Sequence, residues 1–414
     1  MKCVFWFKKD LRLYDNTALI KASEECDQVY PIVVFDSRLT FNDYTSNRRL
    51  YFYLQALKSL SRRIPITILN GDTVIEIKKF MRNVGAEYLF YNKDFDPFIN
   101  YDELCKQVKC KSYKDFLIVE PGELPLYKIF TPYYKRWRDV QKEKPRGYPS
   151  GKFLGDRSEV PELVKAFEIP KADEDSALET LRSFNESLYS MTYTSRLSPY
   201  INTGLISIRV VYWGVKSEEF RRQLAWRDFY YQLYTLRRDY LETGIIRRFN
   251  SNIKWKDNEE EFNAWTNGMT GIPIIDAGMR ELNSTGYIHN RIRLLVSYFL
   301  TKVLGIDWRK GAKYFMQQLL DGDYILNTAN WQWVAGVGAD TRIHRRFNII
   351  SQGKMYDSKG EYIKRWVTEL SNVPQEYIHE PWKMSYWLQR EVGVIIGKDY
   401  PYPIADPRGY FINY

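Results

Sequence analysis

The sequence predicts an α/β N-terminal domain, with a doubly wound parallel sheet of the Rossmann-like type, followed by a larger all-α domain. The first 120 residues alternate short apolar runs with helix-length segments, which is typical of strands joined by right-handed helical crossovers. After Ser176 the strand-like runs stop and long helical patterns replace them. These two observations together define the predicted fold class.

Short, continuously apolar runs predict five buried parallel strands. They occupy residues 4–7, 29–35, 66–69, 88–91 and 116–119. Residues 48–62 and 73–84 lie between these runs and have the length and pattern of crossover helices. Neither a GxGxxG fingerprint nor a P-loop occurs, so the usual motifs for dinucleotide and nucleotide phosphates are excluded.

A change in composition separates the two parts of the chain. Residues 121–171 are rich in Pro, Gly, Lys and Tyr, which is typical of a linker. Beyond it, long helices are expected over 217–242 and 291–304, among others. We therefore expect an α/β domain over 1–122, a linker over 123–175 and a helical domain over 176–414.

The composition limits the possible functions. No apolar stretch approaches the roughly 20 residues of a membrane span, and the N-terminus has no signal-peptide pattern. Cys3, Cys26, Cys105 and Cys110 form no CxxC pair, so we expect reduced thiols in a cytoplasmic protein. The sequence contains only three histidines, which are the residues that most zinc sites and every Ser-His-Asp triad require. No metal is therefore expected. The net charge of +10 suits a polyanionic partner, although many basic proteins bind nothing acidic.

Three tryptophans of the helical part, Trp255, Trp308 and Trp331, stand beside polar motifs. Indoles spaced along a helical domain can pass an electron stepwise, whereas a lone tryptophan is more often a core residue. Just before Trp331 lie Asp321-Gly322-Asp323 and Asn327. These residues are interpreted as a general acid/base pair, as the polar rim of a cofactor or as a simple turn.

Two further motifs are candidates for ligand binding. Residues 194–200 (TSRLSPY) predict a loop leading into a helix, where hydroxyls and an arginine suit a pyrophosphate or form an ordinary N-cap. Gln223, Trp226, Arg227 and Tyr230 share one helix face. That face either lines a cleft for a flat ligand such as a base or belongs to an amphipathic helix.

A basic cluster follows the Trp331–Trp333 segment. Its members are Arg342, Arg345, Arg346 and Lys354. Clustered arginines near aromatic rings suit phosphate contacts beside a stacking pocket, and a solvated basic loop is the alternative.

Taken together, these motifs resemble the photolyase/cryptochrome family. The similar segments are residues 4–19 (VFWFKKDLRLYDNTAL), 194–200, 223–230 (QLAWRDFY), 271–293, 305–333 and 361–367 (EYIKRWV). The resemblance covers essentially the whole chain and is densest from 194 to 382. It is greatest to the class I photolyases, which use light and FAD to repair cyclobutane pyrimidine dimers. It therefore implies a monomeric carbon–carbon lyase that binds FAD and damaged DNA. No association with a membrane is expected.

The resemblance also implies roles for individual residues. Those expected around FAD are Thr194, Ser195, Arg196, Leu197, Ser198, Phe220, Arg227, Asn290, Arg293, Asp321, Asp323 and Asn327, with Arg293 neutralising one acid and the rotatable amide of Asn327 facing N5. Those expected to bind the lesion or DNA are Gln223, Trp226, Tyr230, Asn290, Arg291, Leu294, Trp333, Arg345 and Gln352. Trp331, Trp308 and Trp255 match a relay that photoreduces FAD. Trp226 and Trp333 are expected to wedge a dimer that has flipped out of the stack.

The chain departs from the family pattern at several positions. Gln223 stands where cyclobutane enzymes usually carry Glu, and Gln is typical of (6-4) photolyases and animal cryptochromes. Leu294 replaces the usual Met, but (6-4) enzymes have His at the positions of both Asn290 and Leu294, so cyclobutane repair is favoured. The segment before Thr194 lacks the usual Tyr-x-x-x-Arg-x-x-Pro pattern, and residues 340–345 are one residue shorter than the family motif.

Two questions stay open at the level of sequence. A cryptochrome-like photoreceptor without repair activity is the main alternative, followed by a (6-4) photolyase. The α/β domain is compatible with a second, light-harvesting chromophore, which could be a folate, a deazaflavin or a flavin, or with none.

Overall fold

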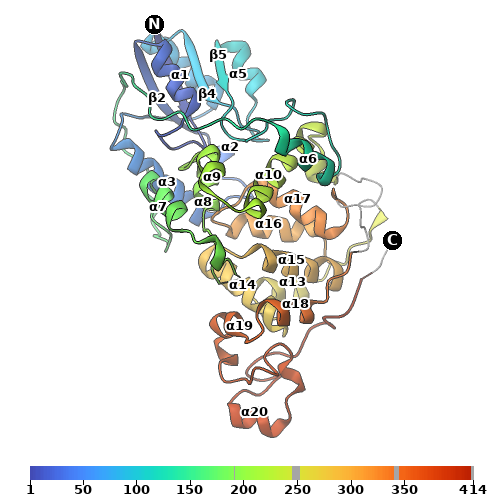
Figure 1. Ribbon diagram of the computed structural model, residues 1–414. Helices are drawn as coiled ribbons and strands as arrows, with labels where there is room; N and C mark the ends of the chain where they lie inside the picture. The colour runs from blue at the N-terminus through green and yellow to red at the C-terminus, as the bar shows by residue number, and fades with distance from the viewer. Residues whose placement is uncertain (191, 245–251, 340–344, 412–414) are drawn as a thin grey trace. The chain divides into compact units, whose positions relative to one another are not determined.

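The computed structural model describes residues 1–190, 192–244, 252–339 and 345–411 (Figure 1). The chain divides into two compact units. Unit 1 comprises Met1–Glu186, Ser195–Arg238 and Asp321–Asp323, and unit 2 comprises Ser187–Thr194, Asp239–Leu320 and Tyr324–Tyr414. Unit 1 contains segments of all three regions that the sequence predicts. The expected domain boundaries at residues 122 and 175 remain a prediction.

Unit 1 is built on a five-stranded parallel sheet. Its strands are β1 (Lys2–Phe7), β2 (Gln28–Phe35), β3 (Thr67–Asn70), β4 (Tyr88–Asn92) and β5 (Cys110–Tyr113). They lie in the order β3-β2-β1-β4-β5, and every neighbouring pair is parallel. This order reverses direction between β1 and β4, as in doubly wound folds. The predicted fold class is confirmed.

Residues 116–119 are not a strand, contrary to the prediction. The fifth strand of the sheet, β5, which pairs with β4, lies earlier in the sequence, at Cys110–Tyr113. The apolar run is buried for another reason: the backbone N–H groups of Ile118 and Val119 donate to the carboxylate of Asp228, at 3.4 and 2.9 Å. A loop buried in this way has the same apolar pattern as a buried strand, so the pattern alone does not separate them.

The helices of unit 1 follow or connect these strands. They are α1 (Thr17–Glu25), α2 (Ser37–Thr40), α3 (Asn47–Ser61), α4 (Thr73–Val84), α5 (Tyr101–Gln107), α6 (Phe130–Asp139), α7 (Glu174–Ser183), α8 (Ser198–Thr203), α9 (Ile208–Gly214) and α10 (Glu218–Leu236). The predicted crossover helices correspond to α3 and α4. The region expected to be a linker contains α6. The helix expected over 217–242 is α10, which ends at Leu236.

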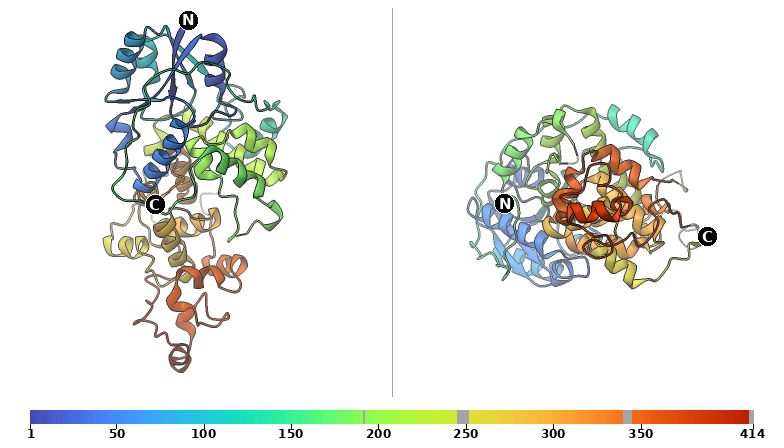
Figure 2. Two further views of the ribbon diagram at one scale, coloured as in Figure 1. Left: turned by 90° about the vertical axis from the view of Figure 1, so that its left-hand side faces the viewer. Right: turned by 90° about the horizontal axis from the view of Figure 1, so that it is seen from below.

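Helices cover both faces of the sheet (Figure 2). Val4 and Trp6 of β1 are buried in one cluster with residues of α4 and α5. Alternate residues of a strand point to opposite faces, and Cys3 accordingly meets Cys26 at the C-terminal end of α1. The sheet is therefore buried on both sides, which explains the continuously apolar runs of its strands.

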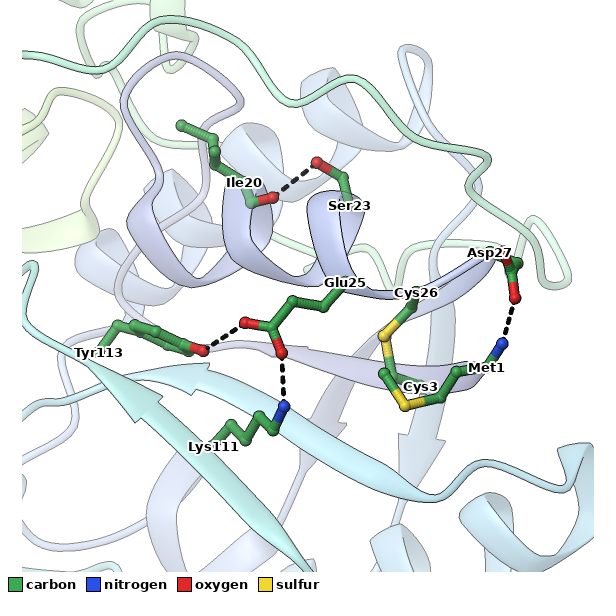
Figure 3. The surroundings of a disulfide bond; sticks show 9 residues. All are labelled: Met1, Cys3, Ile20, Ser23, Glu25, Cys26, Asp27, Lys111 and Tyr113. Carbon is green, nitrogen blue, oxygen red and sulfur yellow. Dashed lines mark hydrogen bonds and ion pairs between the residues drawn. A yellow bond between two sulfur atoms is a disulfide. The ribbon is translucent and has the colours of Figure 1, made fainter.

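Two disulfides join the four cysteines, contrary to the expected reduced thiols. Cys3 is bonded to Cys26 (Figure 3), and Cys105 is bonded to Cys110. The first pair is 23 positions apart in sequence, and the β1–α1 connection brings the two residues together. The prediction rested on the absence of a CxxC pair. That criterion considers only cysteines close together in the sequence, and it misses cysteines that the fold brings together.

Unit 2 is helical. Its elements are α11 (Tyr240–Thr243), α13 (Glu259–Thr266), α14 (Pro273–Thr285), α15 (Asn290–Tyr298), the π-helix η2 (Phe299–Val303), α16 (Trp308–Gln318), α17 (Tyr324–Ala335), α18 (Ile349–Tyr356), α19 (Glu361–Trp366), the short 3₁₀ turns η3 (Thr368–Leu370) and η4 (Pro381–Lys383), and α20 (Tyr386–Val392). A further 3₁₀ turn, η1 (Glu186–Leu188), begins at the end of a unit 1 segment. The helix expected over 291–304 is α15 continued by η2. None of the described helices is long and apolar enough to cross a membrane.

Candidate functional site

Two of the predicted relay residues lie on α16 and α17, two helices that pack against each other. Trp331 of α17 and Trp308 of α16 are 2% and 1% exposed. Gly311 of α16 packs closely against the Trp331 indole, because a Cβ at Gly311 would come within 2.2 Å of Cη2 of that ring. Trp308 is one turn before Gly311, and residues three apart share a helix face. Both indoles belong to the buried core of unit 2.

The third predicted relay residue lies on a segment paired with the start of α16. Lys256 forms an isolated parallel bridge with Ile306, two residues before Trp308. Trp255 is therefore held beside the chain that leads into α16. It is partly buried against the unit 2 core, and its Nε1 is buried without a hydrogen-bond partner among the described residues. The three tryptophans thus run from two fully buried rings to a partly buried one, while their electron-transfer role remains a prediction.

Asn327 lies on α17 one turn before Trp331 and is 9% exposed. Its Nδ2 donates to the backbone oxygen of Ala312, at 2.9 Å. A flip of the amide would bring Oδ1 against that oxygen and lose the hydrogen bond. This hydrogen bond defines the orientation of the amide in this structure. The rotation that the resemblance implies for it stays a prediction.

The other residues of unit 2 expected to bind FAD cluster around the start of α15. Thr194 and Tyr287 share a hydrogen bond between their hydroxyl groups, at 2.8 Å. Asn290 is exposed at the first position of α15, and Nε of Arg293 donates to the backbone oxygen of Ile288, at 2.9 Å. The polar groups of Thr194 and Arg293 are thus attached to the segment that precedes α15.

The residues of unit 2 expected to bind DNA include two side chains in direct contact. The guanidinium of Arg345 lies 4.6 Å from the centroid of the Trp333 ring, a favourable cation–π distance. Arg291 lies over an aromatic ring of α18, which also carries Gln352. Leu294 packs against the edge of the unit 2 core. Residues 340–344, which include the predicted Arg342, lie outside the described residues.

In unit 1 the helix that follows the 195–198 loop is hydrogen-bonded to the acidic turn 321–323. The loop leads into α8, whose Asn202 donates through Nδ2 to the backbone oxygen of Gly322, at 2.9 Å. The Oδ1 atom of Asn202 is buried without a hydrogen-bond partner among the described residues. Arg196 adopts a positive φ of 53°, which curls the loop. Sequence analysis missed Asn202, because an asparagine inside a short helix gives no signal of its own.

A buried tyrosine binds one of the predicted acids. The Tyr231 hydroxyl donates to the carboxylate of Asp323, and both residues are buried. Burial raises the pKa of Tyr231 well above its ordinary value, and the charge of Asp323 raises it further. The phenol therefore stays protonated and fixes the carboxylate. The motif 223–230 ends one residue before Tyr231, so sequence analysis missed it.

The predicted ligand-binding face of α10 is partly occupied by the protein itself. Gln223 is exposed, and its Nε2 donates to Oε1 of Glu219, at 3.1 Å. Trp226 stacks on Phe130, with ring centroids 3.7 Å apart and an interplanar angle of 8°. Tyr230 is buried and lies 5.4 Å from the Trp226 ring. One face of the Trp226 indole is therefore covered by Phe130.

Two neighbouring charges attach α10 to the loop 116–119. Arg227 donates to the backbone oxygen of Phe116, at 2.6 Å. Asp228 accepts from Nε1 of Trp137, at 2.8 Å, in addition to the two backbone amides of the loop. Burial raises the pKa of Asp228 to about 6 against the charge of Arg227 and these hydrogen bonds. Phe220, expected near FAD, contacts another phenylalanine with ring centroids 6.0 Å apart.

Ion pairs fill the carboxyl edge of the sheet between β1 and β4, where doubly wound folds often bind a ligand. Nζ of Lys8 lies 3.0 Å from the carboxylate of Asp94 and 2.8 Å from the Tyr101 hydroxyl. Nδ2 of Asn92 donates to the carboxylate of Asp10, at 2.7 Å. Burial raises the pKa of Asp10 to about 6, although the hydrogen bond from Lys8 and its charge oppose the rise. Within the described residues, no group of three or more His, Cys, Asp or Glu side chains is arranged to hold a metal ion.

Known proteins match both parts of the chain. The family model for DNA photolyase matches residues 3–150, and the model for the FAD binding domain of DNA photolyase matches residues 220–409. The deoxyribodipyrimidine photo-lyase of Alkalihalophilus pseudofirmus is 32% identical, over 97% of this chain and 94% of the relative. The chain belongs to the photolyase/cryptochrome family. The predicted family and the predicted FAD cofactor are confirmed.

Other relatives of this photolyase/cryptochrome chain differ in their names. A cryptochrome DASH of Natronomonas pharaonis is 31% identical, over 97% of this chain and 98% of the relative. The crystal structure of an archaeal photolyase from Sulfolobus tokodaii, described with two FAD molecules, has a TM-score of 0.87 and 35% identity, covering 98% of this chain and 96% of that one. The predicted enzyme class agrees with the names of the photo-lyases. Membership of the family does not by itself specify the lesion.

The residues described above fit FAD. The dinucleotide needs hydroxyl and amide groups for its phosphates and sugars, and polar partners for its ring system. The loop 195–198 offers hydroxyls on a curled backbone. The helix α8 that follows it carries the Oδ1 atom of Asn202, which is buried and has no hydrogen-bond partner in the described part of the chain. Within unit 1, the buried carboxylates of Asp321 and Asp323 are further polar groups of the kind that the dinucleotide needs. Within unit 2, the amide of Asn327 is a polar group suited to its ring system.

Proposed function

We propose that this protein repairs cyclobutane pyrimidine dimers in DNA by light-driven electron transfer from reduced FAD. The observation that carries the proposal is the series of indoles Trp331, Trp308 and Trp255, two buried and one partly buried, with Asn327 one turn before the first. This series lies within the residues that match the FAD binding domain of DNA photolyase.

Within unit 2, we expect Thr194, Asn290, Arg293 and Asn327 to contact FAD, as the family resemblance implies. The resemblance implies the same role for the loop 195–198, Phe220, Arg227, Asp321 and Asp323, which belong to unit 1. When bound, reduced and excited by blue light, FAD supplies one electron to the dimer and regains it once the cyclobutane bonds have broken. The protein fixes the groups around it: Tyr231 holds Asp323, and the hydrogen bond to Ala312 holds Asn327.

The tryptophan relay serves to restore the reduced cofactor. Trp331 gives up one electron, Trp308 replaces it, and Trp255 then replaces the electron lost by Trp308. Burial of the first two indoles keeps water away from the charged intermediates. The partly buried Trp255 ends the relay at a place that a reductant in solution can reach.

The lesion would be held by aromatic and polar side chains. Phe130 stacks on Trp226 and fixes the orientation of its indole. The indole would then stack on a flipped base. The resemblance implies a stacking role for Trp333 of unit 2 as well, and Arg345 beside Trp333 would bind a backbone phosphate. Asn290 and Leu294 replace the two histidines of (6-4) enzymes, which favours a cyclobutane substrate.

A photoreceptor without repair activity is the second candidate. Gln223 replaces the usual glutamate of cyclobutane enzymes, and a cryptochrome DASH is among the relatives. For the α/β unit, the archaeal structure with two FAD molecules favours a flavin as second chromophore. Because Lys8 and Asp94 fill the edge between β1 and β4, such a chromophore would bind along another part of that edge.

The experiment that tests the proposal compares Trp331→Phe with Trp387→Phe. Trp387 is 76% exposed on α20 and serves as the matched control. Under blue light and an external reductant, oxidised flavin absorbance should bleach in the control at the wild-type rate and persist in Trp331→Phe. Chemically reduced wild-type protein should remove cyclobutane dimers in light but not in darkness. Normal bleaching in Trp331→Phe, or no dimer removal by the wild type, would contradict the proposal.

A further inference from the structure

We propose that Trp265 and Tyr314 form a second electron-transfer branch from Trp331, which ends in a tyrosyl radical near the protein surface. This inference rests on the proposed function, because a photoexcited flavin must be the oxidant. It adds two residues that no motif singled out. All members of the branch belong to unit 2.

The first step of the branch is a direct ring contact. The centroids of Trp331 and Trp265 are 5.9 Å apart, and the rings are edge-to-face at 75°. Trp265 is fully buried, and its Nε1 donates to the backbone oxygen of Val296, at 2.9 Å. Phe315 contacts both indoles, with centroids 5.0 Å from Trp331 and 6.1 Å from Trp265. Phe315 therefore packs against both indoles of this step.

The second step leads toward solvent. The ring of Tyr314 lies 5.9 Å from that of Trp265, at 62°. Tyr314 is partly buried, and its hydroxyl donates to Oδ1 of Asn283, at 2.7 Å. Nδ2 of Asn283 in turn donates a hydrogen bond to the backbone oxygen of Thr266, at 2.7 Å. The phenol is thus fixed at the end of a series of ring contacts that starts at Trp331.

The chemistry of the phenol makes Tyr314 a suitable end point. Burial raises the pKa of Tyr314, although its hydrogen bond with Asn283 opposes the rise, so the phenol is protonated before the reaction. A protonated phenol loses its proton when it is oxidised, because the phenol radical cation is a strong acid. The neutral radical that remains has no charge to attract the electron back.

The electrons and protons balance. One electron leaves Trp331 for the photoexcited flavin, and the resulting indole radical cation takes one electron from Trp265. The Trp265 radical cation then takes one electron from Tyr314. The phenolic proton leaves for water, since the amide of Asn283 accepts a hydrogen bond but is not a base. The net result is one electron and one proton lost from Tyr314.

The test uses the FAD-loaded protein with the main relay blocked by Trp308→Phe. After a laser flash, transient absorption should show a residual long-lived photoreduction, together with the spectrum of a neutral tyrosyl radical. Its formation should be slower in D₂O than in H₂O. Adding Tyr314→Phe, which removes only a hydroxyl, should eliminate the radical and reduce the residual photoreduction to that of Trp331→Phe. Trp265→Phe in the same background should have the same effect.

Tyr386→Phe in the Trp308→Phe background is the matched control. Tyr386 is 58% exposed on α20, and its substitution should leave the tyrosyl signal unchanged. Absence of long-lived photoreduction in Trp308→Phe, or a tyrosyl signal that survives Tyr314→Phe, would overturn the branch. Absence of photoreduction in the wild type would instead contradict the proposed function, so the two failures are distinguishable.

Discussion

Replacing Gln223 by glutamate should preserve or raise the repair of cyclobutane dimers. Gln223 is exposed on α10, and its side chain lies 3.1 Å from that of Glu219, one turn earlier. The introduced carboxyl would stand roughly 4 Å from the Glu219 carboxylate, and two like charges at that distance in water repel by about 1 kcal/mol. One pKa unit corresponds to about 1.4 kcal/mol, so the pKa of the introduced carboxyl should rise by roughly 0.7 and the group should stay ionised at pH 7.

The assay measures light-driven dimer repair by the chemically reduced protein as a function of pH. Gln223→Glu should gain a negative charge for the dimer, and repair should fall once that carboxyl is protonated at low pH. Adding Glu219→Gln removes the repulsion and should shift the acid midpoint down by roughly 0.7 pH units. Glu219→Gln alone is the control. Complete loss of repair in Gln223→Glu with FAD still bound would refute the assignment of this position to the lesion.

Three other predictions concern DNA, disulfides and acid stability. Arg345→Gln should reduce the slope of log affinity for damaged DNA against log salt by about 0.9, the value for one phosphate contact, as measured by fluorescence anisotropy; an unchanged slope would exclude that contact. Cys3→Ser removes the bond to Cys26 across 23 positions and should lower the free energy of unfolding by about 3 kcal/mol in urea titrations; reduced wild-type protein that unfolds like oxidised protein would contradict this. Burial acts to raise the pKa of Glu380, but three cations outweigh it and lower the pKa to about 2. Because the folded pKa lies below the unfolded one, the stabilisation is present above pH 4.5 and is lost as pH falls toward 2. Glu380→Gln should therefore cost about 1–3 kcal/mol at pH 7 and little at pH 2, and an equal cost at both pH values would count against the ion pairs.

Local patterns predicted the elements of the sheet well, and failed where long-range packing decides the structure. The helix at 73–84 and the first four strands follow from hydrophobic period and length, which are local properties. Residues 116–119 have the same apolar composition as a strand, but Asp228 binds their backbone. The disulfide pairing of Cys3 likewise depends on the fold, because the connection from β1 through α1 brings Cys26 back beside Cys3.

The candidate site shows the same division. The motifs around Trp331, Asp323 and the loop 195–198 could be recognised because several informative residues stand close together in the sequence. Asn202 and Tyr231 could not, since each acts through a partner 120 or 92 positions away. A single polar or aromatic residue carries no pattern, so only the fold reveals such contacts.

The most direct test of the central claim is repair by the purified, reduced protein on two oligonucleotides, one with a cyclobutane thymine dimer and one with a (6-4) photoproduct. Each is exposed to blue light and compared with a dark control. Light-dependent reversal of the cyclobutane lesion alone is the predicted result, and it would show that Gln223 supports repair. Reversal of neither lesion, by protein that binds FAD and photoreduces it, would contradict the repair function and favour a photoreceptor.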